Sequence, residues 1–227
     1  DVFKQAIRIK PDDPKGYCGM GFSCVELGRY DEAIHACKQA VNLKPDYARA
    51  HIGLGMAYEG LRRYDEAVEA FKQAVAVDPD SADAYLNLGL VYGRLSRFDE
   101  AIEACKRAVQ IKPDHAAAHF ALGMAYNELG RYEEALEAFK QAVRIRADFA
   151  NAHLNLGITY GQLGRYQEAI DAFKRAVSLT PNDADAHFGL GLSYLSMGDK
   201  GSALEEYKVL KTLNKTMANE LFDRIYR

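Results

Sequence analysis

Four histidines recur at regular spacing, and imidazole nitrogens can ligate zinc or act as general bases. His51, His119, His153 and His187 are separated by 68, 34 and 34 residues. Matched positions in stacked helical repeats lie about one helix diameter apart, roughly 10 Å, whereas a metal ion and its nitrogen ligands are about 2 Å apart. We therefore expect these histidines to pack between helices, and we predict no metal site.

The carboxylates and cysteines also lack a spacing that would suit catalysis or metal binding. Adjacent carboxylates recur where helices are expected to begin, and negative charge there favours the helix dipole, so we do not interpret them as acid–base pairs. The carboxylate pairs are Asp31-Glu32, Asp65-Glu66, Asp99-Glu100 and Glu133-Glu134. The four cysteines form no zinc-site spacing and are expected to fill small core positions. They are Cys18, Cys24, Cys37 and Cys105. We predict no enzyme activity and no cofactor.

The elements that would position these residues are set by a repeat of 34 residues. Glycine and alanine recur in separate series with this period. The glycine series is Gly21, Gly55, Gly89, Gly123, Gly157 and Gly191, and one alanine series is Ala33, Ala67, Ala101, Ala135, Ala169 and Ala203. Proline and aromatic residues follow the same period. Several independent series with one period indicate a repeat protein.

Each period is predicted to form two helices. Residues 84–95 place apolar side chains at helical spacing, and Ser96, which is glycine in most other periods, ends that pattern. Residues 101–109 form a second apolar stripe. We expect Asp114 to cap the helix that follows.

The glycines inside the first helix of each repeat require an explanation, because glycine in a helix interior costs about 1 kcal/mol relative to alanine. We expect close approach of two backbones, with Gly89 facing Ala101 of the second helix. The same pairing is expected for Gly55 with Ala67 and in the later repeats.

Composition limits the remaining possibilities. The chain has 227 residues, of which 48% are apolar, and its 29 Lys plus Arg and 32 Asp plus Glu give a formal net charge of −3. These values are typical of a globular chain with a buried core and argue against a disordered one. No basic block suggests nucleic-acid binding. No apolar run reaches the roughly 18–20 residues that a membrane-spanning helix needs.

The order of residues within each period resembles the tetratricopeptide repeat (TPR). In the second repeat the matching residues are His51, Leu54-Gly55, Tyr58, Ala67, Phe71, Ala74 and Pro79. One departure is the first aromatic position, which is histidine four times and never tryptophan. The resemblance implies an all-α fold, a right-handed superhelix of antiparallel helix pairs, called an α-solenoid.

We expect a single TPR domain over residues 1–227. It would comprise 1–13 as the second helix of a truncated repeat, full repeats at 14–47, 48–81, 82–115, 116–149 and 150–183, a divergent repeat at 184–214, and a C-terminal capping helix at 215–227. The sixth repeat diverges at Leu210, where earlier repeats have alanine. Phe3, Ala6 and Ile7 are expected to form an exposed apolar edge.

The resemblance also implies that the first helix of each repeat lines a concave groove. The fifth and ninth positions of these helices are apolar in all six repeats: Cys18, Phe22, Ile52, Met56, Leu86, Leu90, Phe120, Met124, Leu154, Ile158, Phe188 and Leu192. One interpretation is a two-column apolar stripe that binds a peptide or an amphipathic helix. The alternative is that these residues pack against neighbouring helices as core.

Polar residues surround this stripe, among them two asparagines that share the sixth position of their repeats. The predicted peptide-binding residues are Phe22, Arg49, Ile52, Met56, Leu86, Asn87, Leu90, Arg94, Phe120, Met124, Asn127, Leu154, Asn155 and Ile158. Asp83, Glu128 and Gln162 add further charge and polarity. Apolar residues at the fifth and ninth positions argue against a clamp for a C-terminal carboxylate.

The predicted function is a non-catalytic scaffold or adaptor whose partner is a protein or peptide ligand. Self-assembly through repeat edges, giving a homo-oligomer, is one alternative. The repeat arm of a larger enzyme is another. We expect neither nucleic-acid binding nor an integral membrane protein. The expected compartment is the cytoplasm, and a periplasmic or secreted origin stays open because the chain begins within a repeat.

Overall fold

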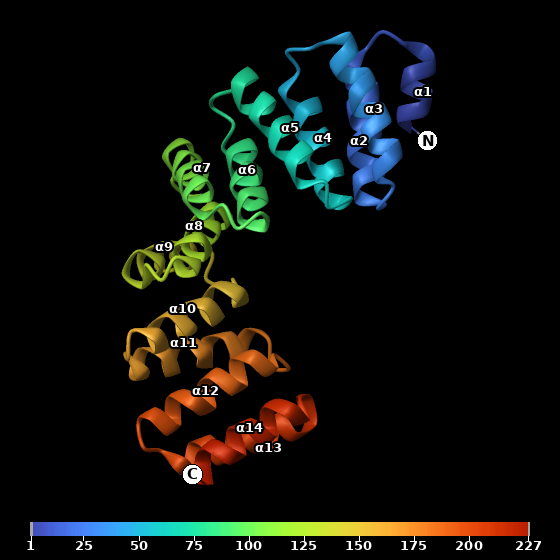
Figure 1. Cartoon of the computed structure of the whole chain (residues 1–227). Coiled ribbons are helices and arrows are strands. Elements are labelled where there is room, and N and C mark those ends of the chain that lie inside the picture. The colour runs from blue at the N-terminus through green and yellow to red at the C-terminus, as the bar shows by residue number, and fades with distance from the viewer. Residues whose placement is uncertain (1, 227) are drawn as a thin grey trace. The chain divides into compact units, whose positions relative to one another are not determined.

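The structure is a computed structural model that describes residues 2–226 and the side chains of all of them except Val2 and Lys4. Within this range the chain forms fourteen α-helices and no strand (Figure 1). In chain order they are α1 (Val2–Ile9), α2 (Pro14–Glu26), α3 (Tyr30–Leu43), α4 (Ala48–Gly60), α5 (Tyr64–Val77), α6 (Ala82–Arg94), α7 (Phe98–Ile111), α8 (Ala116–Glu128), α9 (Tyr132–Ile145), α10 (Ala150–Gln162), α11 (Tyr166–Leu179), α12 (Ala184–Ser196), α13 (Lys200–Leu213) and α14 (Lys215–Tyr226). The predicted all-α class is confirmed.

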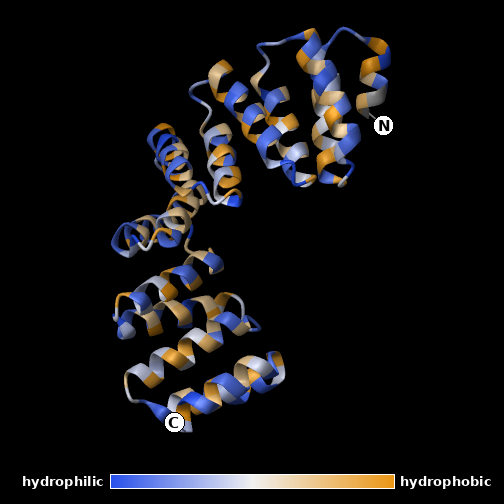
Figure 2. Ribbon diagram, viewed as in Figure 1, coloured by the Kyte–Doolittle hydropathy of each residue, from blue (hydrophilic) through white to orange (hydrophobic). Residues whose placement is uncertain are grey.

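The helices pair as the period predicts. Each full repeat contributes a first helix of 13 residues and a second of 14, and the two run antiparallel (Figure 1). Within each unit, the core lies between the helices of one pair and the pair that follows, and it is filled by the small and aromatic series. The connections between pairs are largely hydrophilic (Figure 2). This is the arrangement of an α-solenoid.

The turn inside each repeat depends on one residue in the left-handed region. Gly28, Gly130, Gly164 and Gly198 have φ between 69° and 80° there. Arg62 and Ser96 adopt φ 58° at the same position, which L-residues with a Cβ rarely do. Glycine was predicted to end the first helix, and the positive φ at this position explains the preference.

The glycine series marks a close approach, and the expected partner is confirmed at Gly89, where a Cβ would lie 3.2 Å from the Ala101 carbonyl oxygen. The nearest side chain, however, belongs to the residue four positions further along the second helix. A Cβ on Gly55 would lie 2.6 Å from the ring of Phe71, four residues beyond Ala67, and one on Gly89 would lie 2.5 Å from Sγ of Cys105, four residues beyond Ala101. The alanines are buried beside these contacts. The first helix therefore needs glycine to admit the larger side chain one turn further along the second helix.

Side-chain caps begin only some of the helices. Asp13, Ser81 and Asp183 accept backbone amide hydrogens at the start of α2, α6 and α12. The prediction for Asp114 was wrong by one residue, because the N-cap of α8 is His115 and its side chain makes no capping bond. Capping is therefore not a constant feature of the repeat.

A feature that sequence reasoning missed recurs at the start of the second helices. Arg97 lies over the ring of Tyr92, 4.6 Å from its centroid, and its guanidinium donates to Glu100 at 2.9 Å. Arg63 and Arg165 make the same pair of contacts. The arginine thereby links the end of the first helix to the first turn of the second.

The chain divides into two compact units between Pro113 and Asp114. The N-terminal unit contains α1 to α7, and the C-terminal unit contains α8 to α14. None of the helices within residues 2–226 has the length and apolar character needed to cross a lipid bilayer.

The terminal helices differ from the repeats. On α1, Phe3 packs against Gly19 but stays exposed, and Ile7 is half-buried against Gly16. The other end closes over a separate core cluster, Ala203, Leu210, Ala218, Leu221 and Ile225. Leu210 is fully buried there, so the departure from alanine supplies volume beneath α14. The outer face of α14 carries exposed Phe222 and Tyr226.

Candidate functional site

Burial varies among the residues of the predicted apolar stripe. At the fifth position Cys18 and Leu86 are 1% and 9% exposed, whereas at the ninth position Leu90 and Ile158 are 42% and 37% exposed. Cys18 and Leu86 therefore pack as core, whereas Leu90 and Ile158 face solvent. The other residues of the stripe are partly buried.

A pocket of the C-terminal unit lies between α10 and α12 and has a volume of about 670 Å³. Leu154 and Ile158 of α10 face Phe188 and Leu192 of α12 across it. Three of the predicted site residues, Leu154, Asn155 and Ile158, line this pocket. Four large apolar side chains thus converge from two first helices.

The floor of this pocket is an aromatic ring held between two glycines. Phe173 of α11 is buried, and a Cβ on Gly157 or Gly189 would lie 2.8 Å or 2.5 Å from its ring atoms. All three residues line the pocket. Because both glycines lack side chains, the Phe173 ring packs between them and forms the base of the cavity.

Polar groups surround this apolar pocket. Asn155 donates its side-chain amide to the Asn151 carbonyl oxygen at 2.8 Å, which directs its own carbonyl oxygen elsewhere. Asp185 lies in the first turn of α12. Arg224 of α14 also lines the pocket and donates to Glu220 at 2.7 Å. Such a rim suits a ligand with an apolar side chain and a polar backbone.

The N-terminal unit has a pocket of about 430 Å³ with different chemistry, lined by Val25, Tyr30, Met56, Glu59, Gly60, Arg62, Tyr64, Asn87 and Arg94. Met56, Asn87 and Arg94 were predicted site residues. Glu59 was not, although it has the same repeat position as the predicted Asn127, and the two tyrosines were not because they begin second helices. Burial raises the pKa of the Glu59 carboxyl, and the positive charge of Arg94 partly opposes that rise.

The remaining predicted residues lie outside these two pockets. Arg49 stacks over the Phe22 ring at 5.2 Å. Phe120 packs on Phe139 and Phe149, with ring centroids 5.7 Å and 4.8 Å apart. The Oδ1 atom of Asn127 is buried without a hydrogen-bond partner among the described residues. Neither pocket includes the other four, which are Ile52, Leu86, Leu90 and Met124.

The histidines make backbone contacts in their repeats. Nε2 of His51 donates to the Pro45 carbonyl oxygen at 2.8 Å, and Nε2 of His153 donates to that of Ala147 at 3.0 Å. Each bond fixes the ring against the preceding loop. Within the described residues, no group of three or more histidine, cysteine or acidic side chains is placed to hold a metal ion.

The cysteines are free and buried. Burial raises the pKa of Cys37 and of Cys105 to about 12. A thiol with such a pKa remains protonated and is a poor nucleophile at neutral pH. These residues occupy the aromatic position of the second helix and act in packing.

Comparison with known families gives two matches. Residues 2–188 match the model described as the C-terminal domain of cilia and flagella-associated protein 70, and residues 162–215 match a tetratricopeptide repeat model. The search of curated proteins gives no match.

Many solved structures share this architecture. YrrB, described as a TPR protein with an unusual peptide-binding site, is 25% identical over 82% of this chain and 96% of its own, with a TM-score of 0.67. MamA is 29% identical over 75% of this chain and 93% of its own, with a TM-score of 0.66. A chain of the APC/C hetero-tetramer Cut9-Hcn1 is 21% identical with a TM-score of 0.79, which shows the fold alone; the match covers all of this chain but 45% of that one.

Proposed function

This chain belongs to the tetratricopeptide repeat family, and we propose that it is a non-catalytic interaction module that binds a peptide or an amphipathic helix of another protein. The proposed site is the pocket between α10 and α12 in the C-terminal unit. Its ligand would insert an apolar side chain among Leu154, Ile158, Phe188 and Leu192 while its backbone meets the polar rim.

The observation that carries this proposal is the depth and apolar lining of that pocket. Ile158 is 37% exposed on a helix whose neighbouring apolar residues are buried. Large apolar side chains that converge on a pocket of about 670 Å³, with polar groups at its edge, are typical of ligand sites. YrrB, one of the structural relatives, is described as having a peptide-binding site, which supports a peptide as the ligand class.

We propose selection from a random peptide library displayed on phage as the test. The wild-type chain should enrich peptides with a large apolar residue. Ile158→Glu should weaken their binding at least about tenfold, because a charge would enter an apolar contact. Leu129→Glu is the matched control, since Leu129 is 40% exposed in the same unit but outside the pocket.

Circular dichroism separates loss of binding from loss of folding in both variants. Equal affinity of Ile158→Glu and the wild type for every enriched peptide would contradict the proposed site. The predicted residues outside this pocket are tested in the same way with Met56→Glu and Met124→Glu together, one from each unit.

Self-association is a second candidate, favoured by one observation. Phe222 and Tyr226 are exposed on α14, and their ring centroids are 4.5 Å apart in a stack that continues to Tyr207. Light scattering at several concentrations tests this candidate. A mass that stays that of one chain at all concentrations would eliminate it.

A further inference from the structure

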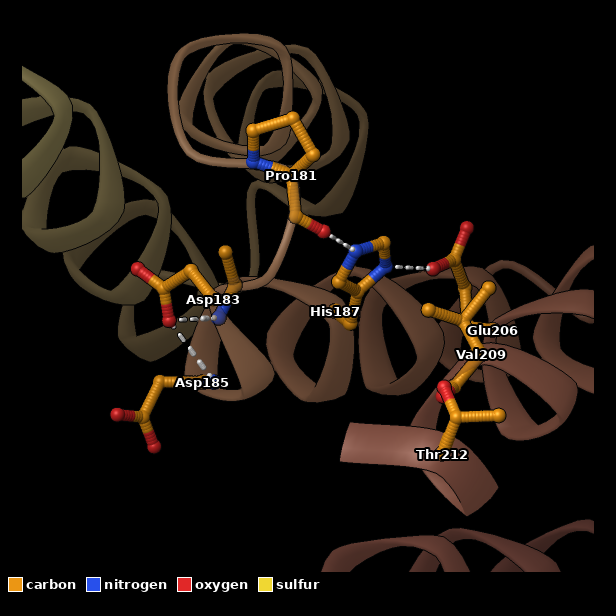
Figure 3. Close-up of polar contacts among 8 residues, drawn as sticks. Pro181, Asp183, Asp185, His187, Glu206, Val209 and Thr212 are labelled. Carbon is orange, nitrogen blue, oxygen red and sulfur yellow. Dashed lines mark hydrogen bonds and ion pairs between the residues drawn. The ribbon is translucent and has the colours of Figure 1, made fainter. Parts of the chain in front are cut away.

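The sixth repeat contains a buried pair of titratable side chains. The ring of His187 in α12 faces the carboxylate of Glu206 in α13, with Nδ1 and Oε2 2.6 Å apart (Figure 3). The Nε2 atom of the same ring lies 2.9 Å from the carbonyl oxygen of Pro181. The two side chains are only 8% and 15% exposed.

Of the two contacts of His187, one recurs in other repeats and one is found in the sixth repeat. The bond from Nε2 to a loop carbonyl is shared, since His51 and His153 also make it. The carboxylate is not shared, because the position of Glu206 is a buried alanine in every earlier repeat: Ala36, Ala70, Ala104, Ala138 and Ala172. A carboxylate therefore replaces a methyl group where α12 and α13 meet.

The contacts of His187 require one proton more than a neutral ring and an ionised carboxylate carry together, and the imidazole is the stronger base of the two. The Pro181 carbonyl oxygen and the Glu206 carboxylate both accept, and a neutral imidazole carries only one N–H. With a neutral ring, one of the two short contacts would bring two lone pairs together. We infer that His187 is an imidazolium in the folded protein, which donates Nδ1–H to Glu206 and Nε2–H to Pro181, and that this protonated pair positions α12 against α13.

The surroundings leave the carboxylate as the charged neighbour of the ring. The groups beside the pair on α13 are Val209 and Thr212, which carry no charge, and Thr212 donates its hydroxyl to the Val209 carbonyl oxygen (Figure 3). The titratable side chains of α10 are His153, which bonds to Ala147, and Tyr160, which lies beneath the Arg165 guanidinium. The other charged groups near α12 have contacts of their own: Lys174 lies over the Tyr194 ring, Lys211 lies over the Tyr207 ring, Lys208 pairs with Glu205, Arg224 pairs with Glu220, and Asp183 accepts from the Asp185 and Ala186 amides.

The fifth repeat provides a natural contrast. There burial lowers the pKa of His153 and the nearby Arg175 lowers it further, against the bond to Ala147. In the sixth repeat the position of Arg175 is Val209 and the position of Ala172 is Glu206. Two substitutions thus exchange a cation for a carboxylate beside the same histidine.

The pair also bears on the candidate pocket. Phe188, Gly189 and Leu192 form its α12 wall, and a Cβ on Gly191 of the same helix would lie 3.4 Å from Cβ of Glu206. When the shared proton is lost, Nδ1 and the carboxylate repel and the packing of α12 on α13 weakens. Any effect on ligand binding rests on the proposed function, whereas the protonation and its effect on stability do not.

Nitrogen NMR of the full chain tests the protonation directly. At neutral pH both ring nitrogens of His187 should show the shifts of protonated nitrogens, whereas His153 in the same sample should show one protonated and one bare nitrogen. A bare nitrogen at His187 would overturn the inference, whether the proton is absent or resides on Glu206.

Thermal unfolding across roughly pH 5 to 9, which brackets the ordinary titration of histidine, tests the positioning role. A proton that the folded state holds more tightly stabilises it at low pH, and that stability is lost as pH rises. As the pH rises, we expect the thermal unfolding midpoint of the wild type to fall by about 2–4 °C more than that of Glu206→Gln. The glutamine amide can donate to a neutral ring, so this variant keeps the bond without needing the extra proton.

Two further variants complete the test. Glu206→Ala, which restores the residue of the other repeats, should lose the alkaline dependence as well. His153→Gln should leave that dependence in place, because a histidine with a lowered pKa costs stability on the acid side instead. Identical pH profiles for the wild type and Glu206→Gln would overturn the positioning role, even if NMR showed the imidazolium.

Discussion

The two pockets lie against the same positions of the repeat but differ in chemistry. In the C-terminal unit the wall is Leu154, Ile158, Phe188 and Leu192. In the N-terminal unit the pocket contains Glu59, Arg62 and Arg94, with Met56 as its large aliphatic side chain. The helix pairs that form the two pockets have equal lengths. A common backbone therefore supports two kinds of surface, and the difference comes from a few positions near the end of the first helix.

The largest expected effect concerns the buried side chain that packs between two glycines of adjacent first helices, which differs between the two units. Phe173 fills the space between two glycines in the C-terminal unit, and Cys37 fills the matching space in the N-terminal unit, where a Cβ on Gly53 would lie 2.7 Å from its Sγ. Phe173→Ala should lower the free energy of unfolding by about 3–5 kcal/mol. Cys37→Ala should cost about 1 kcal/mol, because fewer buried atoms are removed. Urea denaturation measures both, and equal losses would contradict a packing role that depends on side-chain size.

The next effect compares two glycines of α10 that both line the pocket. Gly157→Ala should lower the free energy of unfolding by about 1–3 kcal/mol, because its Cβ would lie 2.8 Å from the Phe173 ring. Gly161→Ala should raise it by about 0.5–1 kcal/mol, since nothing lies within 4 Å of that Cβ and alanine favours the helix. Thermal unfolding of the two variants should therefore shift in opposite directions. A stabilised Gly157→Ala would show that the ring moves aside freely.

A smaller effect is expected at the turn of the second repeat. Arg62 has φ 58°, where four other repeats have glycine. Arg62→Gly should raise the free energy of unfolding by about 1 kcal/mol, because glycine adopts this backbone without steric cost. Gly164→Ala is the reciprocal control and should lose a similar amount. A loss of stability in Arg62→Gly would indicate that its side chain makes a contact worth more than the backbone strain.

The smallest effect concerns the charge in the N-terminal pocket. Because burial raises the pKa of Glu59, the ionised carboxylate weakens the folded state above its titration and ceases to do so below it. Glu59→Gln should therefore raise stability at neutral pH by less than about 1 kcal/mol, since the group is partly exposed. The difference from the wild type should vanish in acid. A variant less stable than the wild type at neutral pH would mean that attraction by Arg94 outweighs burial.

The sequence predicts the fold well because its period is redundant. Glycine, alanine and aromatic series each report the same two helices, so an error in one is corrected by the others. The expected alanine partner is confirmed at Gly89, but the nearest side chain to each glycine lies one turn further along the second helix, at Cys105 for Gly89 and at Phe71 for Gly55. Both residues lie on the same face as the alanine, so sequence spacing alone does not distinguish them. The strained turn at Arg62 was also invisible, since arginine gives no signal for a positive φ.

The site was harder to predict for a different reason. Spacing places the fifth and ninth positions on one face, but burial depends on the neighbouring helix, and only coordinates show that Leu86 is buried while Leu90 is open. Phe173 and Arg224 line a pocket from a second helix and from α14, outside the positions that the resemblance assigns to the groove. Their contributions arise from tertiary contacts that no periodic rule encodes.

The cysteines have a practical consequence. All four precede Asp114, and each is buried. A thiol-alkylating reagent should therefore modify the native chain slowly and should react as the N-terminal unit opens. Mass spectrometry after a short pulse of reagent would then measure the rate at which the N-terminal unit opens, because the C-terminal unit has no thiol that could react.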